Sequence, residues 1–139
     1  MPAEIAFADT NLFLRYLTND LPAQADQVEK LLHRAAKGQV TLITTGLVVA
    51  EIVWTLESYY HLSKKDIQAK VLAILNTDGL NVTDSDLVLQ AVGVFAGKNV
   101  DFIDAYNAAW MLKHNVNTVY TFDQKHFSRF DGIAAAEPQ

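Results

Sequence analysis

The chain has 139 residues, half of them hydrophobic, a formal net charge of −5 and no cysteine. This length fits one ordinary domain that buries a core of its own. The lack of cysteine excludes disulfides, cysteine zinc sites and thiol nucleophiles, and we expect a cytoplasmic protein. The acidic balance argues against a protein that coats nucleic acid through a general basic surface. The longest stretch without Asp, Glu, Lys or Arg is residues 38–50, which is too short to span a bilayer, so we expect neither a membrane segment nor an export signal.

Apolar periodicity predicts strands that alternate with helices along the chain. The expected strands cover residues 5–8, 40–43, 79–82, 118–122 and about 132–136. The expected helices cover residues 11–18, 22–37, a segment capped by Thr44 or Thr45 that runs to about residue 60, then 64–75, 85–97 and 102–114. Alternation of this kind favours parallel pairing, hence an α/β domain of three layers, α/β/α, around a mainly parallel sheet of four to five strands. We expect one domain over residues 1–135 and a frayed tail at 136–139.

Two carboxylates follow predicted strands. Asp9 ends the first strand, and Asp123 follows the strand in "VYTFDQKHF". In a parallel sheet, ligands bind beyond the carboxyl ends of the strands. Both acids are therefore expected at one functional edge.

Three further acids lie on or beside predicted helices. Glu51 is the one charged residue between Gly38 and Leu56, on a largely apolar helix where an unpaired charge is costly. Asp101 and Asp104, in "NVDFIDAYNAAW", are three residues apart at the start of a helix and project from neighbouring positions. All three could face the same ion as Asp9 and Asp123.

Each acid also has a purely structural interpretation. Asp9 and Asp123 could be helix N-caps, and Asp101 with Asp104 resembles a capping arrangement. Glu51 could pair with a basic residue in the core. The residues alone leave these alternatives open.

A cluster of carboxylates without a compensating set of His or Cys repels itself unless cations are present. Mg²⁺ or Mn²⁺ prefers such oxygen ligands and also accepts phosphate oxygens, which suits phosphodiester hydrolysis. The histidines at 33, 61, 114 and 126 have no metal-ligand spacing, and we expect them at the surface or its boundary. Neither a dinucleotide fingerprint nor a P-loop is present in the sequence.

In its acidic segments the chain resembles the PIN domain, and specifically the VapC toxins of toxin–antitoxin pairs. The segments that carry the resemblance are "DTNLFLRYL", "VVAEIVWTL", "DFIDAYNAAW" and "VYTFDQKHF", in the order that the family has them. The resemblance implies that Asp9, Glu51, Asp104 and Asp123 are catalytic and bind metal, with Asp101 as an additional metal ligand. Thr10, Asn11 and Thr121 flank these acids and could hydrogen-bond to carboxylates or waters.

For function, the resemblance implies a Mg²⁺- or Mn²⁺-dependent endoribonuclease that hydrolyses RNA phosphodiester bonds. It further implies a homodimer and inhibition by a cognate antitoxin protein. Two other functions remain open at this point. One is an α/β phosphohydrolase of small phosphate esters, and the other is a non-catalytic RNA-binding module whose acids are only helix caps.

Overall fold

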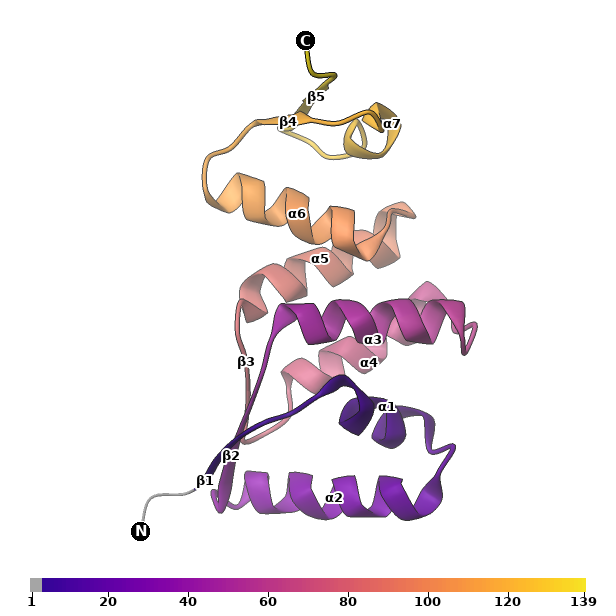
Figure 1. The fold of residues 1–139 in the computed structure, drawn as a ribbon, viewed down its shortest axis with the longest axis vertical. Helices are drawn as coiled ribbons and strands as arrows, with labels where there is room; N and C mark the ends of the chain where they lie inside the picture. Colours follow the sequence, from indigo (N-terminus) through magenta and orange to yellow (C-terminus); the bar gives the residue numbers. More distant parts are fainter. Residues whose placement is uncertain (1–3) are drawn as a thin grey trace. The chain divides into compact units, whose positions relative to one another are not determined.

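The computed structural model describes residues 4–139, and these form two compact units. The first unit ends at Ser85, and the second runs from Asp86 to Gln139. Figure 1 follows the chain from β1 in indigo to β5 in yellow.

The first unit contains a parallel sheet, which over the described residues has three strands in the order β1-β2-β3. The strands are β1 (Glu4–Phe7), β2 (Val40–Thr44) and β3 (Leu80–Val82). β2 lies in the centre, where Ala6 pairs with Leu42 on one side and Leu42 pairs with Leu80 on the other. The carboxyl ends of all three strands therefore lie along the same edge of the sheet.

Four helices pack with this sheet. They are α1 (Thr10–Thr18), α2 (Pro22–Ala36), α3 (Gly46–Ser58) and α4 (Lys64–Leu75). α1 packs against α2 and α3, and α3 against α4, while α2 contacts β2 and α4 contacts β3. Leu56, Ile67 and Val71, on α3 and α4, are fully buried. Burial of each such side chain contributes about 1.5–3 kcal/mol to the stability of the fold. These contacts therefore hold α3 and α4 in place.

Gly79 allows the chain to enter β3 close to the end of α2. Its φ is +80°, and a Cβ atom there would lie 2.3 Å from the backbone oxygen of Ala35. Gly38 also has a positive φ, +78°, but a Cβ atom there would meet nothing within 4 Å. Gly79 is thus required both by its backbone conformation and by the close approach of α2.

The second unit contains helices and a smaller parallel pair of strands. Its elements are α5 (Ser85–Lys98), α6 (Phe102–Lys113), β4 (Thr118–Tyr120), α7 (Gln124–Phe127) and β5 (Ala134–Ala136). α7 packs on α6 and on β5, as Figure 1 also shows. The rings of Phe95 and Phe102 meet edge to face, and the Lys113 amine bonds to the Asp86 carboxylate at 2.9 Å. These contacts connect α5 to α6 within the unit.

The strand pairing differs from the prediction of one sheet with four to five strands. Over residues 4–139, β4 pairs with β5 and the three other strands pair among themselves. The strand expected at 118–122 ends at Tyr120, because the chain bends at Phe122 before α7. The predicted fraying of residues 136–139 stays a prediction, although Ala136 pairs in β5. In the described part of the chain, no helix is both long and apolar enough to cross a membrane.

Candidate active site

A buried hydrogen-bond network fixes the end of β1, where Asp9 leaves the sheet. The Ala8 N–H donates to the Ile43 carbonyl at 2.9 Å, and the Thr44 hydroxyl donates to the Ala8 carbonyl at 2.8 Å. The Thr83 N–H donates to the Thr44 carbonyl at 3.0 Å. Thr44 and Ala8 are both completely buried. Thr44 therefore joins the carboxyl ends of all three strands and holds the residue that precedes Asp9.

Asp9 itself is exposed at the N-cap position of α1. Thr10 follows it and is 3% exposed, and its Oγ1 atom has no hydrogen-bond partner in the part of the chain that the structure describes. Asn11 is exposed. A buried hydroxyl without a partner is costly, so Thr10 is suited to a ligand or an ordered water that binds next to Asp9.

Glu51 lies on an exposed face of α3. The same face carries Leu47, which is 81% exposed, and Trp54, which is 63% exposed, in an i, i+4, i+7 pattern. Leu47 and Trp54, one turn before and after Glu51, thus point to solvent, whereas Ile52 and Val53 are buried on the opposite face. Glu51 itself is exposed, and no ion pair of its side chain is found among the described residues. Its predicted role as a metal ligand stays a prediction.

The second unit brings three of the predicted acids together with a histidine. The Nδ1 atom of His126 lies 2.5 Å from Oδ2 of Asp123 and 3.9 Å from Oδ2 of Asp104. Asp101 precedes α6, and Asp104 lies in its first turn. Three acids predicted from sequence, from α6 and the segment before α7, therefore form one cluster.

The surroundings of Asp104 in this cluster raise the pKa of its carboxyl group. Partial burial raises the pKa of the Asp104 carboxyl above its ordinary value of 3.8, and the charge on Asp101 raises it further. The charge of His126 lowers the pKa of Asp104, and that of Asp123 raises it. The metal-free cluster thus disfavours the carboxylate form of Asp104, and a cation bound there would favour it.

The capping interpretation can be compared with real caps in the same molecule. Thr45 and Ser63 each accept a hydrogen bond from the third backbone N–H of their helix, at 3.3 and 3.1 Å. Asp9, Asp101 and Asp123 also stand at N-cap positions, yet within residues 4–139 none of their side chains accepts such a bond. The three acids occupy cap positions without capping their helices, and Oδ2 of Asp123 contacts His126 instead.

Thr121 supports Asp123 through the backbone. Its hydroxyl oxygen accepts a hydrogen bond from the Asp123 N–H at 3.0 Å, and its own N–H donates to the Ala136 carbonyl at 2.9 Å. The observed partner of the Thr121 hydroxyl is an amide, while its predicted role toward a carboxylate or water stays a prediction. Thr121 ties the segment before Asp123 to β5.

Sequence reasoning missed two residues of the site. His126 was expected only at the surface; it is half exposed, but it also contacts Asp104 and Asp123. Its spacing of three residues from Asp123, at the start of a helix, is the signal that could have indicated this contact. Thr44 was considered only as a helix cap, and its hydroxyl is used instead between strands. A long-range bond of this kind has no local sequence signal.

The side-chain oxygens of the cluster are of the type that binds a hard divalent cation. Asp101, Asp104 and Asp123 offer carboxylate oxygens, which Mg²⁺ and Mn²⁺ prefer. As the side chains stand, no group of three Asp, Glu or His among the described residues is arranged to hold a metal ion. Asp9 and Glu51 belong to the first unit, and the binding of one ion by all five acids stays a prediction.

Comparison with known proteins adds independent evidence. The chain is 22% identical over 117 residues to a VapC ribonuclease of Aquifex aeolicus (strain VF5), a match that covers 84% of this chain and 86% of that protein. The sequence model of the PIN domain family matches residues 6–133, which include all five predicted acids and parts of both units. The family fold is α/β/α, so the predicted fold class is confirmed, with smaller sheets than expected. From this match over nearly its whole length, the chain belongs to the PIN domain family.

Proposed function

We propose that this protein is a metal-dependent endoribonuclease that acts as the toxin of a toxin–antitoxin pair. The observation that carries the proposal is the set of acids at helix starts that do not cap their helices. A helix without a side-chain cap is less stable by about 1 kcal/mol, so these positions are better explained by ligand binding than by folding. The similarity to a VapC ribonuclease supports RNA as the substrate.

In this proposal Asp9, Glu51, Asp104 and Asp123 hold Mg²⁺ or Mn²⁺, with Asp101 as a further ligand. Such an ion, when bound by these residues, would supply Lewis-acid chemistry for the phosphate and for the attacking water. Other residues of the chain position the proposed ligands. Thr44 holds the backbone before Asp9, and Thr121 holds the backbone N–H of Asp123.

His126 has a separate role in the proposed site. Its imidazole lies against Asp123 and Asp104, where a positive charge would partly offset the repulsion between the acids before the metal binds. It thereby keeps the two carboxylates near each other in the metal-free protein.

The proposed partners follow from the same similarity. We expect a homodimer, an antitoxin encoded beside this chain, and action on RNA in the cytoplasm. Sedimentation of the purified protein alone and with the neighbouring gene product tests the two protein partners. A single species of monomer mass in both measurements would contradict them.

The test of the activity is RNA cleavage by purified protein free of any antitoxin. Chelation by EDTA should abolish cleavage, and added Mg²⁺ or Mn²⁺ should restore it. Asp104→Asn should lower the rate at least about 100-fold, since even loss of an outer-shell partner costs 10- to 100-fold. Asp66→Asn, an exposed acid in the first turn of α4, is the matched control and should cut normally.

Three outcomes would contradict the proposal. Undiminished cleavage after stringent chelation would rule out a metal mechanism. Intact RNA together with turnover of a small phosphate ester would instead favour the phosphohydrolase alternative, and RNA binding without metal binding or turnover would favour the non-catalytic module.

A further inference from the structure

Arg129 joins the two segments of the second unit that carry its cluster of acids. It lies in the turn after α7, and its Nη1 atom donates a hydrogen bond to the backbone carbonyl of Asn99 at 2.8 Å. Asn99 is the first residue after α5, and Asp101 follows shortly after it. Asp123 stands at the N-cap of α7, upstream of Arg129. One side chain therefore connects the loop before Asp101 to the segment after Asp123.

The acceptor side of this bond leads directly into α6. Asn99 has a positive φ of 53° less two, that is 51°, and the next residue, Val100, is buried. Asp101 follows at the N-cap of α6, and its carbonyl accepts a hydrogen bond from the Ala105 N–H at 3.0 Å. A shift of the Asn99 carbonyl would therefore be carried through one buried residue to the start of the helix that bears Asp104.

The donor side of the bond leads back to α7. The Phe130 N–H donates to the Phe127 carbonyl at 3.1 Å, and the rings of these two buried residues lie 5.9 Å apart. Arg129 lies inside this closed turn, between the two phenylalanines. Its position is thereby coupled to that of α7, the helix that begins after Asp123.

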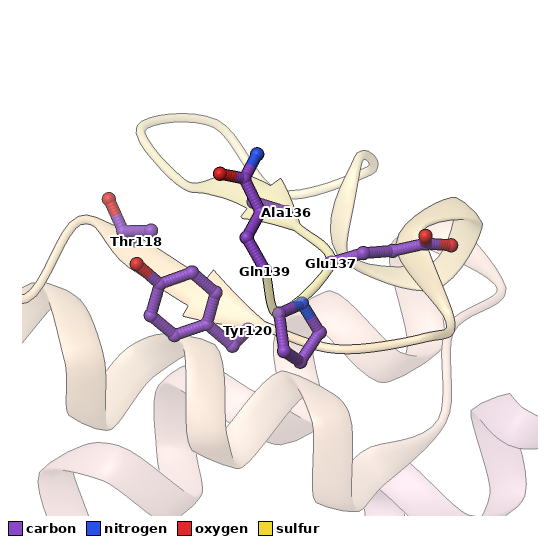
Figure 2. A pocket seen from close by; sticks show the side chains of 6 residues that line it. Thr118, Tyr120, Ala136, Glu137 and Gln139 are labelled. Atoms are coloured by element: carbon purple, nitrogen blue, oxygen red, sulfur yellow. The ribbon is translucent and has the colours of Figure 1, made fainter.

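The chain before Asp123 is held separately. Tyr120 of β4 pairs in register with Ala136 of β5, and Figure 2 shows both residues beside the pocket that they help to line. The Thr121 hydroxyl accepts a hydrogen bond from the Asp123 N–H at 3.0 Å. Asp123 is thus tied to β5 on one side, while the segment that follows it is tied to the loop before α6 through Arg129.

The contact of Arg129 differs from those of His126 and Lys98 in the same unit. His126 touches two of the proposed metal ligands, and a bound cation would compete with it for them. The Lys98 amine lies 3.9 Å from the Asp131 carboxylate, beyond hydrogen-bond distance, and both side chains are exposed. Arg129 uses none of the acids. Because its guanidinium stays protonated and its acceptor is a backbone carbonyl, this contact persists whether or not metal is bound.

We propose that Arg129 is a positioning residue of the metal site. By holding the Asn99 carbonyl, it sets the separation between the loop that leads to Asp101 and the segment that follows Asp123, so that their carboxylates can reach one ion. It touches neither the ion nor the RNA. This inference rests on the proposed function, since it concerns the metal that these acids would bind.

The experiment measures Mn²⁺ binding by calorimetry, on purified protein without RNA. Arg129→Met removes the donors but keeps a long side chain, and it should lower Mn²⁺ affinity by about 10-fold, as loss of an outer-shell partner does. Arg129→Lys should retain most of the affinity, since the bond uses one nitrogen and an ammonium group can also donate. An effect of charge alone has the opposite sign. Because a positive charge repels a cation, its removal would leave Mn²⁺ affinity unchanged or raise it.

Lys98→Met is the matched control. Lys98 is the last residue of α5, directly before Asn99, and its replacement also removes one positive charge. Because its ion pair with Asp131 is exposed and contributes little, the control should bind Mn²⁺ like the unmodified protein. In RNA cleavage at low Mn²⁺, Arg129→Met should lower the rate without changing KM for RNA, and the rate should recover as Mn²⁺ is raised.

Equal Mn²⁺ affinity of Arg129→Met and Lys98→Met would overturn the positioning role, as would a loss in Arg129→Lys as large as that in Arg129→Met. A raised KM for RNA with unchanged Mn²⁺ affinity would make Arg129 an RNA-binding residue and also overturn it. Arg129 is exposed, so metal-free Arg129→Met should melt in one cooperative transition; an unfolded variant would assign Arg129 to folding instead.

The unmodified protein separates this inference from the proposed function. If it binds no Mn²⁺, the proposed function fails and the role of Arg129 fails with it. If it binds Mn²⁺ and cuts RNA, and Arg129→Met does both equally well, the role of Arg129 alone is wrong.

Discussion

The bond from Thr44 to Ala8 allows a test of how the fold positions Asp9. Thr44→Val keeps the branched shape that suits β2 but removes the hydroxyl that donates to the Ala8 carbonyl at 2.8 Å. Because both residues are completely buried, water cannot replace the lost donor. A buried carbonyl left without a partner destabilises the protein by about 1–3 kcal/mol. For a chain of this length, that loss lowers the melting temperature by about 4–12 °C.

The same substitution should also affect catalysis. Asp9 follows the carbonyl that Thr44 holds, and misplacement of a reacting group by about 1 Å can cost about 100-fold in rate. We expect RNA cleavage to fall by up to that factor at a temperature well below the melting transition. Differential scanning fluorimetry gives the stability, and a cleavage assay on total RNA gives the rate.

Thr41→Val provides the control. Thr41 lies on the same strand and is partly buried, and within residues 4–139 its hydroxyl makes no hydrogen bond. The control should change stability by no more than about 0.5 kcal/mol and should cut RNA at the normal rate. If Thr44→Val melted and cut like Thr41→Val, the role assigned to the Thr44 hydroxyl would be refuted.

Three further predictions concern the acids and one turn. The pKa of Asp104 is raised in the folded state, so the stability of metal-free protein falls as pH rises from 3.8 through the folded value. Metal-free Asp104→Asn should therefore melt higher than the unmodified protein at neutral pH and equally at pH well below 3.8; a lower melting temperature at neutral pH would contradict this. Mg²⁺ should raise the melting temperature of the unmodified protein more than that of Asp9→Asn, and an equal rise would remove Asp9 from the metal site. Gly79→Ala should lower the free energy of unfolding in urea by more than Gly38→Ala, because a Cβ at residue 79 would also meet the Ala35 backbone. Equal losses of free energy in the two variants would show that α2 moves to make room for the Cβ.

Local elements were predictable because their signals are local. Thr45 caps the helix for which the sequence offered Thr44 or Thr45, and the helix expected over residues 22–37 ends at Ala36, just before Gly38 with its positive φ. The bounds of α1 to α6 agree with the predicted ones to within two residues, whereas the short α7 has no counterpart among the predicted helices. Short-range capping and apolar periodicity decide these features, and both can be recognised in the sequence.

Long-range choices were not predictable in the same way. Whether β4 joins the other strands or pairs with β5 depends on packing between segments far apart in sequence. Glu51 illustrates the same limit. The apolar residues around Glu51 suggested burial, but Leu47 and Trp54 lie on the same exposed face as Glu51. A helix that is apolar on two faces gives no clear hydrophobic periodicity, so the sequence does not show which face is buried.

The placement of Asp9 and Asp101 has a physical consequence beyond the missing caps. Each stands at the start of a helix of nine or more residues, where the helix dipole contributes about half a positive charge. The field of a helix dipole attracts negatively charged groups in general, and it falls off within the first turn of the helix. Asp104 lies one turn further into α6 and is partly buried, so it receives less of this field and more of the repulsion from its neighbours. Among these three acids, Asp104 is therefore the one that a bound cation would stabilise most.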